Sequence, residues 1–263
     1  MPQSRIYARI RAGEVTCFAE WVADHCLELD SAPWLGGSPT GRRWQHAEVR
    51  LLAPVTPSKI VCVGLNYREH IAESVSVLAG QVPPADPLLF LKPSSAIVGP
   101  GEAIVYPRGV TRLDPEAELG VVVGRPLKHA SIDEATEAIA GLTVFNDVSA
   151  RNYQRSDGQW TRAKGFDTFA PVGPFVVAGL ESGGRIIECR VNGELRQRGD
   201  TTDMIVAVPG LLCHISSIMT LFPGDLVATG TPAGIAPVVA GDRISISIDG
   251  IGTLENYVAE DTH

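Results

Sequence analysis

The sequence contains no long apolar run, and no segment approaches the ~18 apolar residues of a membrane span. Its first residues, Met-Pro-Gln-Ser-Arg-Ile-Tyr-Ala-Arg-Ile, also lack the apolar region of a secretory signal peptide. The five cysteines are odd in number, widely scattered and without a Cys-x-x-Cys pair. This pattern excludes a disulfide framework and a zinc knuckle. We therefore expect a protein of the reducing cytoplasm that has no membrane partner.

Basic residues are outnumbered, since 22 Lys and Arg stand against 30 Asp and Glu, for a net charge of −8. A surface that follows nucleic-acid phosphates needs the opposite balance, so we expect no nucleic-acid partner. The balance still allows a local group of Arg and Lys that binds a small anion. The sequence also lacks a Gly-x-Ser-x-Gly elbow, a dinucleotide fingerprint and a His-Glu-x-x-His motif, which removes several common enzyme classes.

Turn-forming residues are abundant, and the 27 Gly and 19 Pro separate many short apolar runs. Asn192-Gly193 between two such runs is a strong hairpin signal. The capping-box pattern Ser131-Ile-Asp-Glu134 predicts a helix that runs to Ala140, and residues 208–221 predict a second helix. We expect a mostly β fold with a few covering helices, divided into a small N-terminal module at 1–53 and a second domain at 54–263. The other predicted strands cover 5–10, 14–18, 60–63, 88–91, 119–123, 142–147, 226–229, 243–248 and 252–257.

Glu116 and Glu118 introduce the apolar, β-branched run Leu119–Val123, which predicts a strand. Residues two apart on a strand point to the same face, so these carboxylates stand side by side. A third acid, Asp147, ends the predicted strand at 142–147. Burying such a cluster without a cation is costly, and an all-carboxylate set favours Mg²⁺ or Mn²⁺, with Ca²⁺ as a further candidate. The alternative for the pair is a solvated edge face.

Three further groups could carry chemistry. His70 and Glu73 share one face of a predicted helical turn, where the carboxylate would raise the basicity of the imidazole; the alternative is an exposed surface contact. Lys164 lies in a polar, basic and aromatic segment, 149–169, that is expected to line a site. There it could stabilise an enolate, or be merely solvated. The loop at residues 230–234 offers N–H groups and a hydroxyl to an anion, or is simply a turn.

Together these motifs resemble the fumarylacetoacetate hydrolase family in its short form. That form includes acylpyruvases, oxaloacetate decarboxylases and the hydroxyhepta-dienedioate isomerase/decarboxylase. The resemblance runs from about residue 59 to residue 257 and rests on seven motifs in the family's order. They are Val-Gly-Leu-Asn-Tyr-Arg-Glu-His-Ile, Phe-Leu-Lys-Pro-Ser, Glu-Ala-Glu-Leu, Asn-Asp-Val-Ser-Ala-Arg, Trp-Thr-Arg-Ala-Lys-Gly-Phe-Asp, Val-Asn-Gly-Glu-Leu-Arg-Gln and Thr-Gly-Thr-Pro-Ala-Gly.

The resemblance implies a mixed β-sandwich roll of the family's own type, here with a small N-terminal β module before the catalytic domain, and a homodimer. It implies that the segment after His70 orders over bound ligand as a lid. It implies that Glu116, Glu118 and Asp147 bind a divalent metal. It also implies that His70 and Glu73 form a proton-handling dyad and that Lys164 is the active-site lysine. Substrate contacts would come from Arg151, Gln154 and Thr231.

Two departures from the full-length hydrolases matter. The N-terminal part is short, and Asn66 stands where those enzymes place an additional metal-binding acid before the histidine. Both departures favour the short-chain subgroup and a small anionic keto acid other than fumarylacetoacetate. One site of this kind supports C–C hydrolysis, decarboxylation or keto–enol and double-bond isomerisation. A ureidoglycolate-type lyase and a metal-dependent binding module are the other readings.

Overall fold

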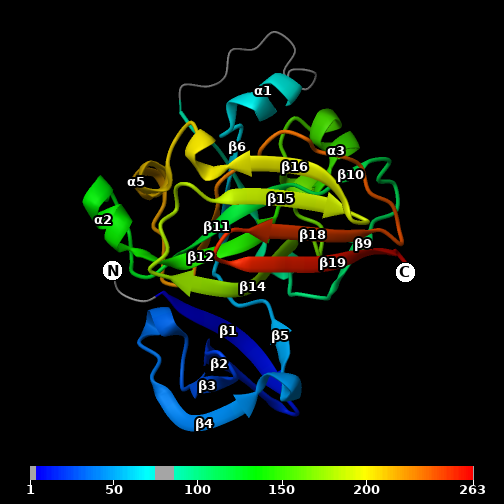
Figure 1. Cartoon of the computed structure of the whole chain (residues 1–263). Coiled ribbons are helices and arrows are strands. Elements are labelled where there is room, and N and C mark those ends of the chain that lie inside the picture. Colours follow the sequence, from blue (N-terminus) through cyan, green and yellow to red (C-terminus); the bar gives the residue numbers. More distant parts are fainter. Residues whose placement is uncertain (1–3, 75–85, 263) are drawn as a thin grey trace.

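The computed structural model describes residues 4–74 and 86–262, with the backbone alone at 72–74 (Figure 1). Its strands form a large sheet, a five-stranded sheet and a two-stranded pair, and few helices cover them. The predicted mostly β fold is therefore confirmed. In this part of the chain no helix is long and apolar enough to cross a membrane.

The large sheet contains strands from before residue 53 and strands from the rest of the chain. In spatial order its path is β4 (Pro39–Gln45), β3 (His25–Leu29), β2 (Val15–Trp21), β1 (Arg5–Ala12), β14 (Ala170–Ala178), β12 (Ile139–Asn146), β11 (Ala117–Val123), β17 (Leu226–Ala228), β6 (Ile60–Gly64) and β7 (Leu88–Lys92). Strand β5 (Arg50–Leu52) pairs with β1, and β8 (Ile97–Val98) pairs with β14. The pairings β11–β12 and β11–β17 are antiparallel, whereas β17 runs parallel to β6.

The second sheet crosses in front of the first in Figure 1. Its order is β16 (Glu194–Asp200), β15 (Ile186–Val191), β18 (Arg243–Ile248), β19 (Gly252–Glu260) and β9 (Ala103–Tyr106), while β10 (Leu113–Asp114) pairs with β13 (Ser149–Ala150). The predicted hairpin is present, and Asn192 and Gly193 have φ of 52° and 86°. Both residues therefore adopt the left-handed conformation that a tight hairpin turn requires.

Strand β11 is buried along its whole length because both of its faces are covered. Val121 packs in a core cluster with Ile187 and Ile246 of the second sheet. On the opposite face, Val122 packs with Phe145 and other residues of a separate cluster. Because both faces of the strand are buried, its residues do not alternate between apolar and polar. This explains the continuous apolar run in the sequence.

The helices are α1 (Arg68–Ser74), α2 (Ile132–Glu137), α3 (Arg151–Ser156), α4 (Thr161–Lys164) and α5 (Val208–Ile218), with short 3₁₀ turns at Pro33–Leu35, His46–Glu48, Ser94–Ala96 and Thr201–Asp203. The capping box of α2 is confirmed, because the Ser131 hydroxyl accepts from the Glu134 N–H and the Glu134 carboxylate accepts from the Ser131 N–H. The predicted end at Ala140 is wrong. From Ile139 the chain belongs to β12, since its pairing with β11 outweighs the local helical preference.

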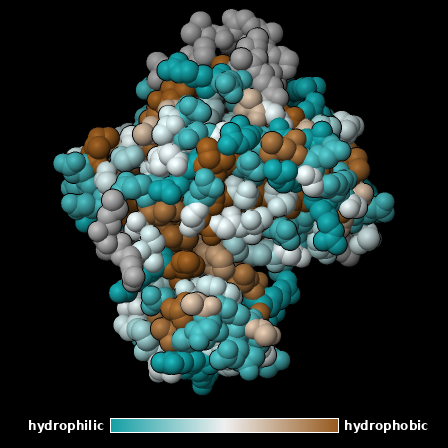
Figure 2. Space-filling model, viewed as in Figure 1, coloured by the Kyte–Doolittle hydropathy of each residue, from teal (hydrophilic) through white to brown (hydrophobic). Residues whose placement is uncertain are grey.

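The strands before residue 53 join the large sheet directly. Residues 5–7 of β1 pair with β14, and β2, β3 and β4 continue outward from β1 (Figure 1). The ring of Trp21 lies 5.1 Å from that of Phe175 on β14. Figure 2 shows hydrophobic residues gathered where these strands meet the rest of the molecule. Residues 33–41 include a 3₁₀ turn and the start of β4.

Candidate metal centre and substrate cavity

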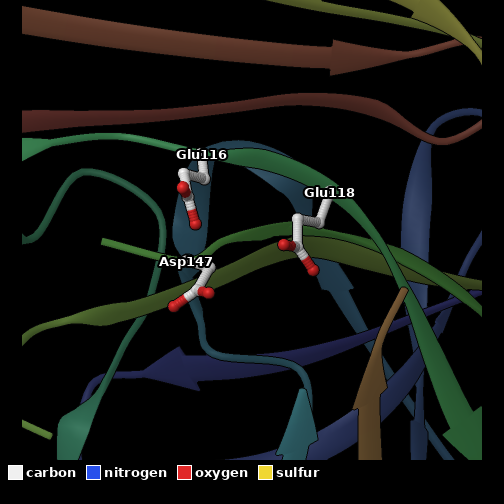
Figure 3. Close-up of side chains that lie close together, drawn as sticks. All are labelled: Glu116, Glu118 and Asp147. Carbon is white, nitrogen blue, oxygen red and sulfur yellow. The ribbon is translucent and has the colours of Figure 1, made fainter. Parts of the chain in front are cut away.

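The three predicted acids come together at one end of the β11–β12 pair. Ala117 is in register with Asn146, so the residues beside them, Glu116 and Asp147, are neighbours, and the Asp147 N–H donates to the Glu116 carbonyl at 2.9 Å. Glu118 follows on β11 with its carboxylate on the same side (Figure 3). One oxygen from each acid lies within 4.8 Å of those of the other two. All three are buried.

Two of the acids are surrounded by cations. The Lys164 ammonium donates to Glu116 Oε2 at 2.7 Å and to Asp147 Oδ2 at 2.5 Å. Arg151 donates to Glu116 Oε1 at 2.5 Å, and Lys92 donates to Asp147 Oδ1 at 2.5 Å. Burial alone would raise the pKa of Glu116, but the charges of Arg151 and Lys164 outweigh it and hold that pKa well below its usual range.

Glu118 differs from the other two acids. Its Oε2 accepts from the Gly230 N–H at 2.9 Å, and it makes no ion pair with any described residue. Burial, followed by the charges of Asp147 and Glu116, raises the pKa of Glu118 well above its usual range. A buried carboxylate beside two others, without a cation of its own, fits a site built for an added cation. Its hard oxygen ligands suit a divalent ion such as Mg²⁺ or Mn²⁺.

Hydrogen bonds from outside the acids hold their backbone in place. Asn146 Oδ1 accepts from the Glu116 N–H, and Gln197 Oε1 accepts from the Ala117 N–H, each at 3.0 Å. The Gln197 amide nitrogen donates to Thr231 Oγ1 at 2.8 Å, and this hydroxyl donates to the Ala117 carbonyl at 2.8 Å. Gln197 thus ties the residue between the two glutamates to the loop at 230–234.

The sequence reasoning missed Gln197, Lys92 and Asp114. Gln197 lies about 80 residues from the acids, and only the second sheet brings it to them. Lys92 directly follows the predicted strand at 88–91 and is buried against Asp147. Asp114 is buried beside Arg151, whose Nε donates to it at 2.8 Å. The repeated acids in Leu-Asp-Pro-Glu-Ala-Glu were the available signal for Asp114, because i, i+2 and i+4 share a strand face.

A cavity of about 260 Å³ opens over the acids. Arg151 and Gln154, from α3, line it, and Arg151 Nη1 donates to Gln154 Oε1 at 2.9 Å. The other lining residues are Val63, Gly64, Leu65, His70, Phe90, Arg112, Glu116, Glu118, Asp147, Arg155, Trp160, Lys164, Thr231 and Ile235. The structure therefore gathers eight of the nine predicted site residues around one cavity.

The ninth is Glu73, whose backbone lies in α1 and whose side chain is outside the described residues. The predicted lid falls largely on residues 75–85, which are also outside them. Asn66 is used for structure: its amide donates to the Thr229 and Val206 carbonyls and accepts from the Val206 N–H.

A family model described as fumarylacetoacetate (FAA) hydrolase C-terminal matches residues 59–259. The chain belongs to this family. A second model, described as Rv2993c-like, N-terminal, matches residues 7–54. The family is one of enzymes, and related members include isomerases, hydrolases and oxaloacetate tautomerases.

Relatives of known name support the assignment. Protein Rv2993c of Mycobacterium tuberculosis is 50% identical over 227 residues, which are 84% of each chain. The human mitochondrial oxaloacetate tautomerase FAHD2A is 41% identical over 227 residues, covering 81% of this chain and 70% of that one. The crystal structure of 2-hydroxyhepta-2,4-diene-1,7-dioate isomerase from Mycobacterium marinum has a TM-score of 0.90 at 43% identity, covering 99% of this chain and 100% of that one.

A fourth similar protein was crystallised with a metal. Maleylpyruvate hydrolase from Sphingobium sp. SYK-6, in complex with manganese(II) and pyruvate, has a TM-score of 0.78 at 28% identity and covers 98% of this chain and 100% of that one. The presence of a bound divalent cation in this related enzyme agrees with the presence of the carboxylate triad in this chain.

Proposed function

We propose that this chain is a divalent-metal-dependent enzyme that acts on a small anionic keto or enol acid through an enolate. The observation that carries the proposal is the buried triad of Glu116, Glu118 and Asp147, open to a cavity that basic side chains also line. These acids would hold Mg²⁺ or Mn²⁺. When bound, such a cation supplies Lewis acidity that lowers the free energy of an enolate oxygen.

The surrounding residues have distinct tasks in this proposal. Arg151 and Gln154 are linked side by side and present N–H groups to the substrate carboxylate. The Lys164 ammonium stabilises negative charge that develops on the reacting oxygen. His70, buried at the cavity wall, moves a proton to or from carbon, and Glu73 would fix its tautomer.

The residues permit three reactions that pass through one enolate. Removing a proton from one carbon gives the enolate, and returning the proton to another atom completes isomerisation or tautomerisation. Loss of CO₂ from the keto form leaves the enolate in decarboxylation, and attack of water on a distal carbonyl expels it in C–C hydrolysis of an acylpyruvate; protonation of the enolate completes both. The named relatives above 40% identity, an oxaloacetate tautomerase and a dienedioate isomerase, favour proton transfer as the main activity. A ureidoglycolate-type lyase is the more distant alternative.

The test is turnover of oxaloacetate, acetylpyruvate, fumarylpyruvate and 2-hydroxyhepta-2,4-diene-1,7-dioate with Mg²⁺ or Mn²⁺. We expect turnover of at least one, its loss in EDTA, and its recovery when the metal is returned. Lys164→Met should lower kcat by about 10²-fold or more, because it removes a charge facing the reacting oxygen.

Lys128→Met is the matched control, since the exposed Lys128 ammonium donates to two backbone carbonyls far from the cavity lining and its loss should leave kcat unchanged. No turnover across the panel, or turnover that EDTA leaves intact, would overturn the proposal.

A further inference from the structure

Four basic side chains line the cavity, and one of them differs from the rest. Lys164 and Arg151 contact the buried acids, and Arg112 contacts Asp114. Arg155 is exposed at the cavity, and its guanidinium makes no ion pair or side-chain hydrogen bond with any described residue. Its neighbour Arg162, by contrast, pairs with Asp157. Among the described residues, Arg155 is therefore the cavity-lining cation without an acidic partner.

Arg112 lies beside the same cavity. Its Nε and Nη2 donate to Asp114 at 2.9 and 3.0 Å, and Arg151 donates to the same carboxylate at 2.8 Å. The Asp114 carboxylate is thus shared by two guanidinium groups, of which Arg151 also contacts Glu116. The Arg112 side chain is 40% exposed, so part of its guanidinium remains open to the cavity.

The buried and the exposed parts of the cavity have different chemistry. Arg151 and Arg155 are four residues apart on α3, so they lie on one face, separated by about 6 Å along the helix axis. Arg151 is buried against the acids, whereas Arg155 is exposed. Phe90, Trp160 and Ile235 contribute apolar wall to the same cavity. A ligand that satisfies every part has an anionic keto-acid end, a short carbon chain and a second anion.

We propose that Arg155, together with Arg112, forms the subsite that binds the second carboxylate of a dicarboxylate substrate, and that Arg155 is the residue that sets this specificity. The inference rests on the proposed function, because the metal-binding end must hold the keto acid. Arg155 then determines specificity: it selects dianions over monoanions of the same shape. A guanidinium suits this task, since its planar N–H groups match a carboxylate.

The test compares two ligands of the Mn²⁺-loaded protein, 2-oxoglutarate and 5-methyl-2-oxohexanoate, in which an isopropyl group replaces the distal carboxylate. Dissociation constants are measured by calorimetry for the wild type, Arg155→Gln and Arg162→Gln. The wild type should bind the dianion more tightly. Arg155→Gln should raise the dissociation constant of 2-oxoglutarate by roughly three- to tenfold. It should change the dissociation constant of the monoanion by less than about twofold.

Arg162→Gln controls for the loss of one nearby positive charge, because Arg162 is already paired. It should leave both dissociation constants unchanged. An equal effect of Arg155→Gln on both ligands, no effect on either, or the same effect from Arg162→Gln would overturn the subsite. With a substrate that is turned over, Arg155→Gln should raise KM and leave kcat intact. Failure of the wild type to bind either ligand or turn over any panel substrate would instead reject the proposed function itself.

Discussion

At the scale of single residues, the three acids of the triad are held by different means. Asp147 and Glu116 each contact two basic side chains, so their charges are balanced by the protein itself. The Glu118 carboxylate accepts a hydrogen bond from the Gly230 N–H and makes no ion pair with a described residue. The same substitution of carboxylate by amide should therefore have different consequences at different positions.

Glu118→Gln should abolish Mn²⁺ binding and leave the metal-free protein at least as stable as the wild type. The amide removes a buried charge that no cation balances and still accepts from Gly230. Asp147→Asn should also abolish binding, but it should destabilise the metal-free protein by about 3–5 kcal/mol, because it leaves Lys92 and Lys164 without a shared partner.

Calorimetry with Mn²⁺ and urea unfolding in EDTA measure the two effects separately. Equal stability of the two variants would contradict this account of the charges.

Gln197→Leu tests whether the amide positions the glutamates. It leaves the buried Ala117 N–H and the Pro232 carbonyl without their partner, so a loss of about 1–3 kcal/mol in the free energy of unfolding is expected. If the amide also sets the spacing of the acids, Mn²⁺ affinity should fall as well. Gln197→Glu keeps the acceptor for Ala117 and should recover part of the affinity; unchanged Mn²⁺ binding in Gln197→Leu would argue against the positioning role.

At the scale of elements, the short helices α2 and α3 are formed for different reasons. Helix α2 has a complete capping box in its own sequence. Helix α3 has no side-chain cap and is held by Arg151, whose guanidinium reaches Asp114, Glu116 and Gln154. The first was visible in the sequence, whereas the second depends on contacts that form only in the folded chain.

Ser131→Ala should lower the free energy of unfolding by about 1 kcal/mol, because the Glu134 N–H loses its acceptor. Urea unfolding measures this change. Since α2 packs on α5 and does not line the cavity, the Mn²⁺ dissociation constant should stay unchanged. A loss of Mn²⁺ affinity in Ser131→Ala would contradict the separation of α2 from the site.

At the scale of the whole molecule, the division between residues 1–53 and 54–263 can be tested by deletion. Removing residues 1–53 would uncover the edge of β14 and the ring of Phe175. Exposed strand edges with apolar side chains promote aggregation, so the shortened chain should be poorly soluble. A soluble product with an unchanged Tm would show instead that residues 54–263 form an independent domain.

The opposite end of the large sheet bears on the expected homodimer. Strand β7 ends the described sheet, and the exposed side chain of Leu91 lies beside that of Ile218 in one surface hollow. An open apolar edge of this kind is normally covered. We expect light scattering to give about 56 kDa, twice the 28.0 kDa of the chain, and Leu91→Lys to shift the mass towards the monomer. A wild-type mass of one chain at micromolar concentration would reject the dimer.

The sequence by itself determined the local features that short-range physics controls. The hairpin at Asn192-Gly193 follows from the left-handed turn it needs, the start of α2 follows from its capping box, and the mostly β fold follows from short apolar runs. The seven motifs identified the family that the comparison then showed. Glu116 and Glu118 could be placed side by side because strand geometry has a period of two residues.

Only the tertiary structure decided which distant residues complete the site. Lys92 and Gln197 meet the acids because β7 and β16 are brought to the end of β11, and no local pattern encodes those contacts. The same is true of the end of α2, where sheet pairing prevails over helix propensity. Side-chain periodicity extends over a few residues, whereas the balance of charge around Glu118 depends on packing across the whole fold.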